Sequence, residues 1–344
     1  MNIIEVYDCY EGLTFGGTSK GMAPKWRLED GSWAKQSLLG YESKAEKLIS
    51  DTLGMSTMDD KDFVKFELVD LKIMSSSGII QEGCLSESFL EPGEVEVTFT
   101  RILSAMGIDT GAWLRDNGTI QSRFTSMVTI IKEGTGLDVS DYLRRVIAID
   151  YLFLNEDRHL NNLAIKYTAD GRYVECPVFD NGLSLLSDEE YFPKTREGYG
   201  PTIRSMLRKV KAKPLFSTNH KKQFKVICGG VSPFTIDEQE MRDYLRENRQ
   251  WLGRMYPIML QRIQACPEFF TNEKDVLDFN QEDRSQTNRH EHNHQAQVRV
   301  IHKDDTDKGN WTGRDNSRYP SKPINHKPKH NKDNKMKRNI NKHT

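Results

Sequence analysis

In FLNEDRHLNNLAIKY, residues 153–167, a dense polar centre interrupts two apolar runs. Seven of the eight residues from Asn155 to Asn162 are Asn, Asp, Glu, Arg or His. The preceding segment, DVSDYLRRVIAIDYLFL at 138–154, has the apolar spacing of a buried helix. A loop that only joins two elements does not need so many charged and amide groups, so this loop predicts a chemical role.

Two side chains of the loop have a defined spacing to a later carboxylate. Asp157 and Asn162 are five residues apart, and Asp180 follows the next apolar strand, in VFDNG at 178–182. Kinase-fold phosphotransferases use one Asp to orient the attacking hydroxyl, while an Asn and a later Asp hold Mg²⁺ on the ATP phosphates. Mg²⁺ prefers such oxygen ligands. We therefore predict Asp157 as the catalytic base and Asn162 and Asp180 as metal ligands.

The neighbours of Asp157 have a structural role in this interpretation. We expect Arg158 to tie the loop to a nearby acidic or backbone group. Asp150, on the buried face of the preceding helix, is expected to accept hydrogen bonds from the loop. His159 is interpreted as a hydrogen-bonding residue of the loop, because Asp157 already supplies the base.

A glycine-rich segment upstream fits the same chemistry. FGGTSKGMAPK at 15–25 supplies Gly16, Gly17 and Gly21, and small residues let backbone amides approach phosphate groups. SWAKQ at 32–36 then places Lys35 on a strand, after a hairpin turn at Asp30-Gly31. The segment therefore predicts a phosphate loop followed by a phosphate-binding lysine.

The next two elements supply a partner for Lys35 and a place for adenine. YESKAEK at 41–47 begins a helix in which Glu42 or Glu46 would pair with the lysine. EGCLSES at 82–88 lies where the β-rich front part should join the helical rear part. We expect adenine to contact the backbone there, at Gly83, Cys84 and Leu85.

The order of the loop motif, D-R-H-x-x-N, resembles the HipA-like bacterial kinases and, less closely, the phosphatidylinositol kinases. FDNG, GGTSKGMAPK at 16–25 and KAKPLFSTNHKKQF at 211–224 resemble further parts of the HipA-like pattern. The resemblance runs from about residue 10 to about residue 265 and is nearer to the short members of the family. It implies a two-lobed, protein-kinase-like fold and phosphorylation of Ser or Thr with ATP and Mg²⁺.

The resemblance also implies roles for single residues and for partners. It favours Glu42 over Glu46 as the partner of Lys35, from its distance to Gly54. It implies autophosphorylation in the glycine-rich loop, where Thr18 and Ser19 are the candidates. It implies a protein substrate with a Ser or Thr acceptor, and an antitoxin or host protein as a further partner.

The sequence predicts an α+β protein in three parts. Residues 1–100 form a β-rich N-lobe, 101–272 an α-helical C-lobe, and 273–344 a disordered tail. Mean hydropathy is −0.68, and seven of the nine histidines lie in the tail. From Lys308 to Thr344 the tail has eleven Lys or Arg against two Asp. We interpret it as a solvated segment, with contact to nucleic acid or an acidic surface as the alternative.

The remaining features bear on compartment and on other functions. The five cysteines lack C-x-x-C spacing, no signal peptide begins the chain, and no apolar run could span a bilayer. We therefore expect a cytoplasmic protein with reduced thiols. Two alternatives to a protein kinase stay open: a small-molecule or lipid kinase of the same fold, and a nucleotide-binding scaffold without activity.

Overall fold

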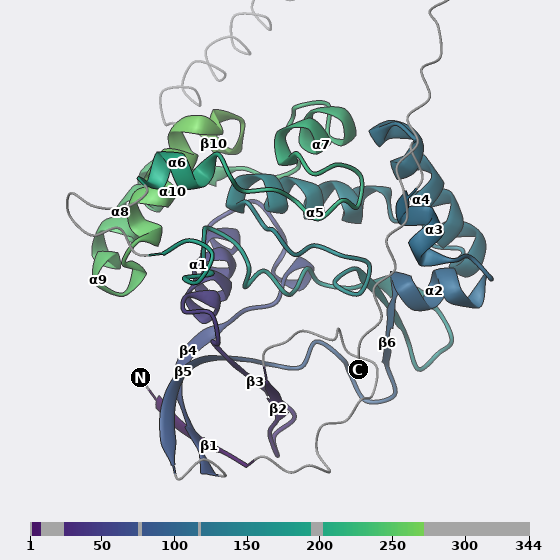
Figure 1. The fold of residues 1–344 in the computed structure, drawn as a ribbon. Helices are drawn as coiled ribbons and strands as arrows, with labels where there is room; N and C mark the ends of the chain where they lie inside the picture. The colour runs from purple at the N-terminus through teal and green to yellow at the C-terminus, as the bar shows by residue number, and fades with distance from the viewer. Residues whose placement is uncertain (1, 8–23, 75–77, 116–117, 194–201, 272–344) are drawn as a thin grey trace, which may run out of the picture. The chain divides into compact units, whose positions relative to one another are not determined.

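The computed structural model describes residues 2–7, 24–74, 78–115, 118–193 and 202–271. These residues form an α+β fold, with a mostly β N-lobe up to Ser86 and a mostly helical C-lobe after it (Figure 1). The expected phosphate loop, with Gly16, Gly17, Thr18, Ser19 and Gly21, lies outside the described residues, as does the tail from residue 273. No helix among the described residues is both long enough and apolar enough to cross a membrane.

The N-lobe sheet has five strands in the order β1-β4-β5-β3-β2. The strands are β1 (Asn2–Val6), β2 (Lys25–Arg27), β3 (Trp33–Gln36), β4 (Glu67–Ile73) and β5 (Ile79–Ser86). β1 is parallel to β4, and the other neighbours are antiparallel. The predicted turn joins β2 to β3, with Gly31 at a φ of 87°, which a glycine adopts without steric cost. This hairpin places Lys35 on the strand beside β5.

One helix, α1 (Glu42–Gly54), packs against β4 and β5. Its apolar face is the one that the sequence spacing predicts, and Ala45, Leu48, Ile49 and Leu53 are all fully buried. Burying a Leu or Ile side chain contributes about 1.5–3 kcal/mol. The same packing turns Glu46 towards the sheet, where it is also buried.

The C-lobe is built around α5 (Ser140–Phe153), in which every residue from Val146 to Phe153 is buried. It packs against α7 (His220–Ile227), and the rings of Tyr151 and Phe224 stack with centroids 4.8 Å apart. Leu154 ends α5 in a left-handed conformation and turns the chain into the polar loop. The other C-lobe helices are α2 (Phe99–Ala105), α3 (Thr110–Arg115), α4 (Ile120–Thr135), α6 (Ile203–Leu207), α8 (Glu238–Glu247), α9 (Arg249–Leu252) and α10 (Met255–Ala265).

Three element boundaries differ from those expected. β6 (Val95–Thr98) pairs with β7 (Ala164–Tyr167), which pairs with β8 (Tyr173–Glu175), so the N-lobe sheet ends at Ser86, not near residue 100. The strand expected to lead into Asp180 stops at Glu175, and Val178 forms only an isolated bridge to Phe63.

The third difference concerns the long helical tract near the end of the C-lobe. In the helical tract at 237–266 the sequence predicts a break near Pro257, because proline disrupts a helix interior, but the break lies at Gly253, which has a φ of 53°. Pro257 stands in the first turn of α10, where a backbone N–H has no partner within the helix and proline is tolerated. The short strands β9 (Ile236–Asp237) and β10 (Phe270–Thr271) pair in parallel beside this tract.

Candidate active site

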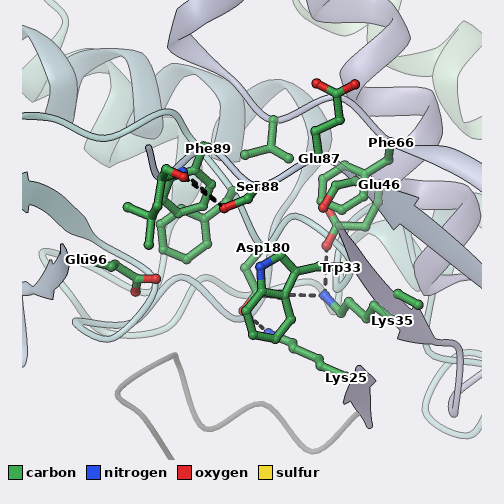
Figure 2. A pocket seen from close by; sticks show the side chains of 15 residues that line it. Lys25, Trp33, Lys35, Glu46, Phe66, Glu87, Ser88, Phe89, Glu96 and Asp180 are labelled. Carbon is green, nitrogen blue, oxygen red and sulfur yellow. Dashed lines mark hydrogen bonds and ion pairs between the residues drawn. The ribbon is translucent and has the colours of Figure 1, made fainter. Parts of the chain in front are cut away.

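Lys35 lies between two carboxylates that are far apart in the sequence (Figure 2). Its Nζ is 2.8 Å from Glu46 Oε1 and 2.6 Å from Asp180 Oδ1. Lys25 Nζ, on β2, is 4.0 Å from the other oxygen of Asp180. Burial alone would raise the pKa of Asp180, but the ammonium groups of Lys35 and Lys25 outweigh it and hold the pKa well below its usual value. Lys35 and Asp180 are therefore both charged at pH 7.

Glu46 is the helix residue that pairs with Lys35, so the expectation that Glu42 would do so is wrong. Glu42 is the first residue of α1, and its Oε1 accepts two backbone N–H groups from the preceding turn, at 2.9 and 2.7 Å. It therefore closes the turn that leads into the helix. One helical turn later, Glu46 also accepts the N–H of Asn181 at 2.9 Å through Oε2. Glu46 thus joins the N-lobe to the turn that contains Asp180.

The turn from Asp180 to Gly182 is shaped by its contact with Lys35 and Glu46. Asp180 has a φ of 58°, a left-handed conformation that Asp tolerates better than most residues. A Cβ at Gly182 would lie 3.3 Å from both Lys35 Nζ and Glu46 Oε1. The glycine therefore allows the turn to approach the Lys35–Glu46 pair closely.

Arg158 ties three segments together within the buried interior. Its guanidinium donates to both carboxylate oxygens of Asp150 on α5, with the shortest contact at 3.0 Å. It also donates to Phe179 O at 2.7 Å and to Asn181 Oδ1 at 2.6 Å. Burial alone would lower the pKa of Arg158, but the Asp150 carboxylate outweighs it and the pKa lies above its usual value. The expected hydrogen bonding of Arg158 and Asp150 is therefore confirmed.

Asp157 and Asn162 occupy different environments in the same loop. The Asp157 side chain is 28 % exposed, and its Oδ1 lies 3.1 Å from Lys213 Nζ. Asn162 is buried, and its Nδ2 donates to Asp157 O at 3.1 Å. The amide oxygen of Asn162 is buried and accepts no hydrogen bond from the described residues. A buried acceptor without a donor is costly, which suits an atom that meets a cation.

A pocket of about 730 Å³, including open solvent at its mouth, lies beside Lys35. Phe89 and Phe179 stack at one wall, with ring centroids 5.6 Å apart. The segment from Ser86 to Leu90 joins β5 to the C-lobe and lines the same pocket. Apolar rings, and backbone groups of the segment after Ser86 that no sheet uses, suit a flat heterocycle.

Gly83, Cys84 and Leu85, the three residues expected at the adenine, are not among the residues that line this pocket. Gly83, Cys84 and Leu85 pair with β3 on one side and β4 on the other. Their backbone groups are therefore used by the sheet. A Cβ at Gly83 would lie 2.4 Å from Leu71 Cδ1, so this glycine serves the packing of the sheet. The connecting segment begins at Ser86.

Glu96 is a pocket residue that the sequence did not indicate. It lines the pocket from β6, and its Oε1 is buried without a hydrogen-bond partner among the described residues. Burial raises its pKa to about 7, against the opposing charges of Lys25 and Arg101. A side chain of this kind is ready to accept a hydrogen bond from a ligand.

Two further residues near the loop also escaped the sequence analysis. Lys213 contacts Asp157 from a segment more than fifty residues away along the chain. His220, at the start of α7, has its Nε2 2.6 Å from Asn155 O, and burial lowers its pKa. The motif KAKPLFSTNHKKQF contains both residues, but nothing in its spacing shows which loop they reach.

The side chains of this site fit a Mg²⁺ ion that binds together with a nucleotide. Among the residues described, no group of three or more His, Cys, Asp or Glu side chains could hold a metal ion. Mg²⁺ bound with a nucleotide needs fewer protein ligands, because water and phosphate oxygens complete its shell. The unpartnered amide oxygen of Asn162 and the carboxylate of Asp180 fit that requirement.

The different contacts of Glu46 and Glu42 give matched predictions. Glu46→Ala should weaken ATP binding about tenfold, because Lys35 loses one partner and the N–H of Asn181 loses its acceptor. Glu42→Ala should leave ATP affinity near wild type and lower the free energy of unfolding by about 1–2 kcal/mol, as for a lost cap. Calorimetric titration and urea unfolding measure the two effects. If Glu42→Ala weakened ATP binding and Glu46→Ala did not, Glu42 would be the residue that supports Lys35.

Comparison with known proteins gives structural similarity only. No family model and no curated protein sequence matches the chain. The structure is similar to the Helicobacter pylori proinflammatory kinase CtkA, with a TM-score of 0.49 and 12 % identity over 73 % of this chain and 92 % of CtkA. It is also similar to HipA of Shewanella oneidensis MR-1, solved with HipB and operator DNA, with a TM-score of 0.38 and 12 % identity. That match covers 71 % of this chain and 58 % of the HipA chain.

Proposed function

We propose that this chain is a protein kinase that transfers the γ-phosphoryl group of ATP to Ser or Thr, with Mg²⁺ as cofactor. The observation that carries the proposal is the placement of Lys35 between Glu46 and Asp180 at the edge of the pocket. Such a lysine neutralises nucleotide phosphates, and the glutamate keeps it in position. Arg158 holds the loop of Asp157 and Asn162 against the same turn.

Each residue then has a defined part in the transfer. Asp157, which is partly exposed, orients the acceptor hydroxyl and accepts its proton as the new O–P bond forms and the bond to ADP breaks. Lys35 offsets charge on the nucleotide phosphates. Asn162 and Asp180 would hold Mg²⁺, which when bound neutralises charge on the phosphate oxygens. Positioning and charge neutralisation supply most of the acceleration.

The pocket supplies the nucleotide contacts in this proposal. Adenine lies against Phe89 and Phe179 and meets the backbone of the connecting segment from Ser86 to Leu90. The buried carboxyl of Glu96 accepts a hydrogen bond from the ribose. Lys25 lies on the phosphate side, near Asp180.

Binding of Mg·ATP tests the proposal directly. Asp180→Asn should lower the affinity for Mg·ATP at least about tenfold, because a charged metal ligand is lost. The affinity for ATP without Mg²⁺ should change much less. Calorimetry on the purified chain measures both, with Asp141→Asn, an exposed aspartate on α5, as the control. Equal Mg·ATP affinity in Asp180→Asn and wild type would remove Asp180 from the metal site.

We propose Ser19 or Thr18 as an autophosphorylation site that inhibits the kinase. A phosphoryl group adds about −1.5 to −2 charge at pH 7, which would repel the ATP phosphates from a loop that should cover them. Mass spectrometry after incubation with Mg·ATP should find one of the two residues modified, and Ser19→Asp should lose substrate phosphorylation. If neither residue were modified, the loop would have no regulatory role and would serve only to bind the ATP phosphates.

A further inference from the structure

A strongly basic surface lies beside the catalytic loop. Residues 208–222, RKVKAKPLFSTNHKK, contain six Lys or Arg and no Asp or Glu. We call this the basic segment; its charged residues are Arg208, Lys209, Lys211, Lys213, Lys221 and Lys222, and all six are exposed. The full chain has a net charge of −1, so this concentration of positive charge is local.

The basic segment touches the catalytic loop at three consecutive residues. His220 contacts Asn155 O at 2.6 Å, the backbone N–H of Lys211 donates to Glu156 at 3.5 Å, and Lys213 pairs with Asp157 at 3.1 Å. The positive charges therefore lie next to Asp157, the residue proposed to orient the acceptor hydroxyl. Whatever presents that hydroxyl must pass close to them.

The segment is held in place by its apolar residues. Leu215 and Phe216 are each only 3 % exposed, and the ring of Phe216 packs edge-on against Trp113. Arg123 donates to Pro214 O at 3.3 Å. These contacts fix the backbone on either side of Lys213 and His220, the two residues whose side chains contact the loop, which favours recognition of charge at defined positions.

The charges are available to a ligand. Within the described part of the chain, Lys213 is the one residue of the six that forms an ion pair with a carboxylate. Unpaired lysines on a surface attract acidic groups and repel basic ones, an effect that salt weakens. The surface is therefore complementary to an acidic partner.

The aromatic residues of this region favour a protein over a nucleic acid. Single-stranded nucleic acids are bound by exposed aromatic rings, on which the bases stack, beside basic groups. Phe216 and Phe224 are buried, at 3 % and 1 % exposed, and cannot serve as such platforms. The basic segment offers charge without a stacking surface.

We propose that the basic segment selects acceptor proteins in which Asp or Glu residues flank the phosphorylated Ser or Thr. This inference rests on the proposed kinase function. It assigns the specificity for the acceptor to charges outside the nucleotide pocket, mainly to Lys221 and Lys222 at the start of α7.

Two fluorescent peptides test the proposal, each with a central Ser and flanked by either Glu or Lys. Binding by fluorescence anisotropy and phosphorylation with labelled ATP are measured on the full chain at physiological salt. The wild type should bind and phosphorylate the Glu peptide at least about tenfold better than the Lys peptide. Lys221→Glu/Lys222→Glu should lose this preference while its Mg·ATP affinity stays unchanged.

Control variants show whether a loss of peptide preference comes from the change in net charge or from misfolding. Lys61→Glu/Lys65→Glu alters net charge equally, at two exposed lysines of the N-lobe, and should keep the preference. Lys221→Gln/Lys222→Gln, which removes charge without reversing it, should fall between wild type and the charge-reversed variant. Circular dichroism of each variant shows whether the fold is kept.

The outcomes separate the inference from the proposed function. Equal use of the two peptides by the wild type would overturn the inference and leave the kinase assignment intact. So would tighter binding of a single-stranded RNA oligonucleotide than of the Glu peptide, if the same two lysines carry it. Selective binding of the Glu peptide without phosphoryl transfer would support the role of the basic segment and contradict the proposed kinase activity.

Discussion

Asp157→Asn should lower phosphoryl transfer by about 10²–10⁴-fold, the range expected for loss of a positioned general base. The amide keeps the size of the side chain but cannot accept the hydroxyl proton. Asp157 lies outside the pocket lining, so affinity for Mg·ATP should stay within about twofold of wild type, a change of no more than about 0.4 kcal/mol. Single-turnover transfer from labelled ATP, with calorimetry of ATP binding, separates the two quantities.

Glu156 supplies the control for this prediction from the same loop. Burial raises the pKa of Glu156 to about 7, and its carboxyl accepts the N–H of Lys211. Glu156→Gln should therefore keep most of the activity, because the neutral form is already populated near pH 7. If Glu156→Gln lost more phosphoryl transfer than Asp157→Asn, Glu156 would be the catalytic base instead of Asp157.

Local pattern was enough to predict most elements that position the site. The hairpin before Lys35, the helix after it and the buried helix before Asn155 all lie where the residue spacing indicated. These elements have strong periodicity or a specific turn residue, and both act over a few residues. The contact between Lys35 and Asp180, across 145 residues, depends on the packing of two lobes.

The errors at the site arise where local pattern cannot decide. Glu42 and Glu46 are one helical turn apart, so helical spacing places both on one face and does not show which one reaches β3. The segment that joins the two lobes could not be located within EGCLSES, because nothing in that stretch marks Ser86 as the end of β5. The partners of the loop, Lys213 and His220, come from a distant segment, and only the tertiary fold brings them to it.

Loss of Arg158 should be among the most destabilising single changes in the chain. Arg158 is 3 % exposed and Asp150 is 4 % exposed, and the guanidinium is the group that compensates the buried carboxylate. Removing one member of a buried ion pair costs about 3–5 kcal/mol, because the other charge stays without a partner. Arg158→Met should lower the free energy of unfolding by that amount in urea denaturation.

A second substitution and a surface pair identify the cause of that loss. Asp150→Asn in the Arg158→Met background should recover part of the stability, since the uncompensated charge is gone. Arg144→Met removes the exposed partner of Asp141 on the same helix and should change stability by no more than about 1 kcal/mol. If Arg158→Met were as mild as Arg144→Met, the link from α5 to Phe179 and Asn181 would not hold the loop. The position of Asp157 would then depend on the contacts of Lys213 and His220 instead.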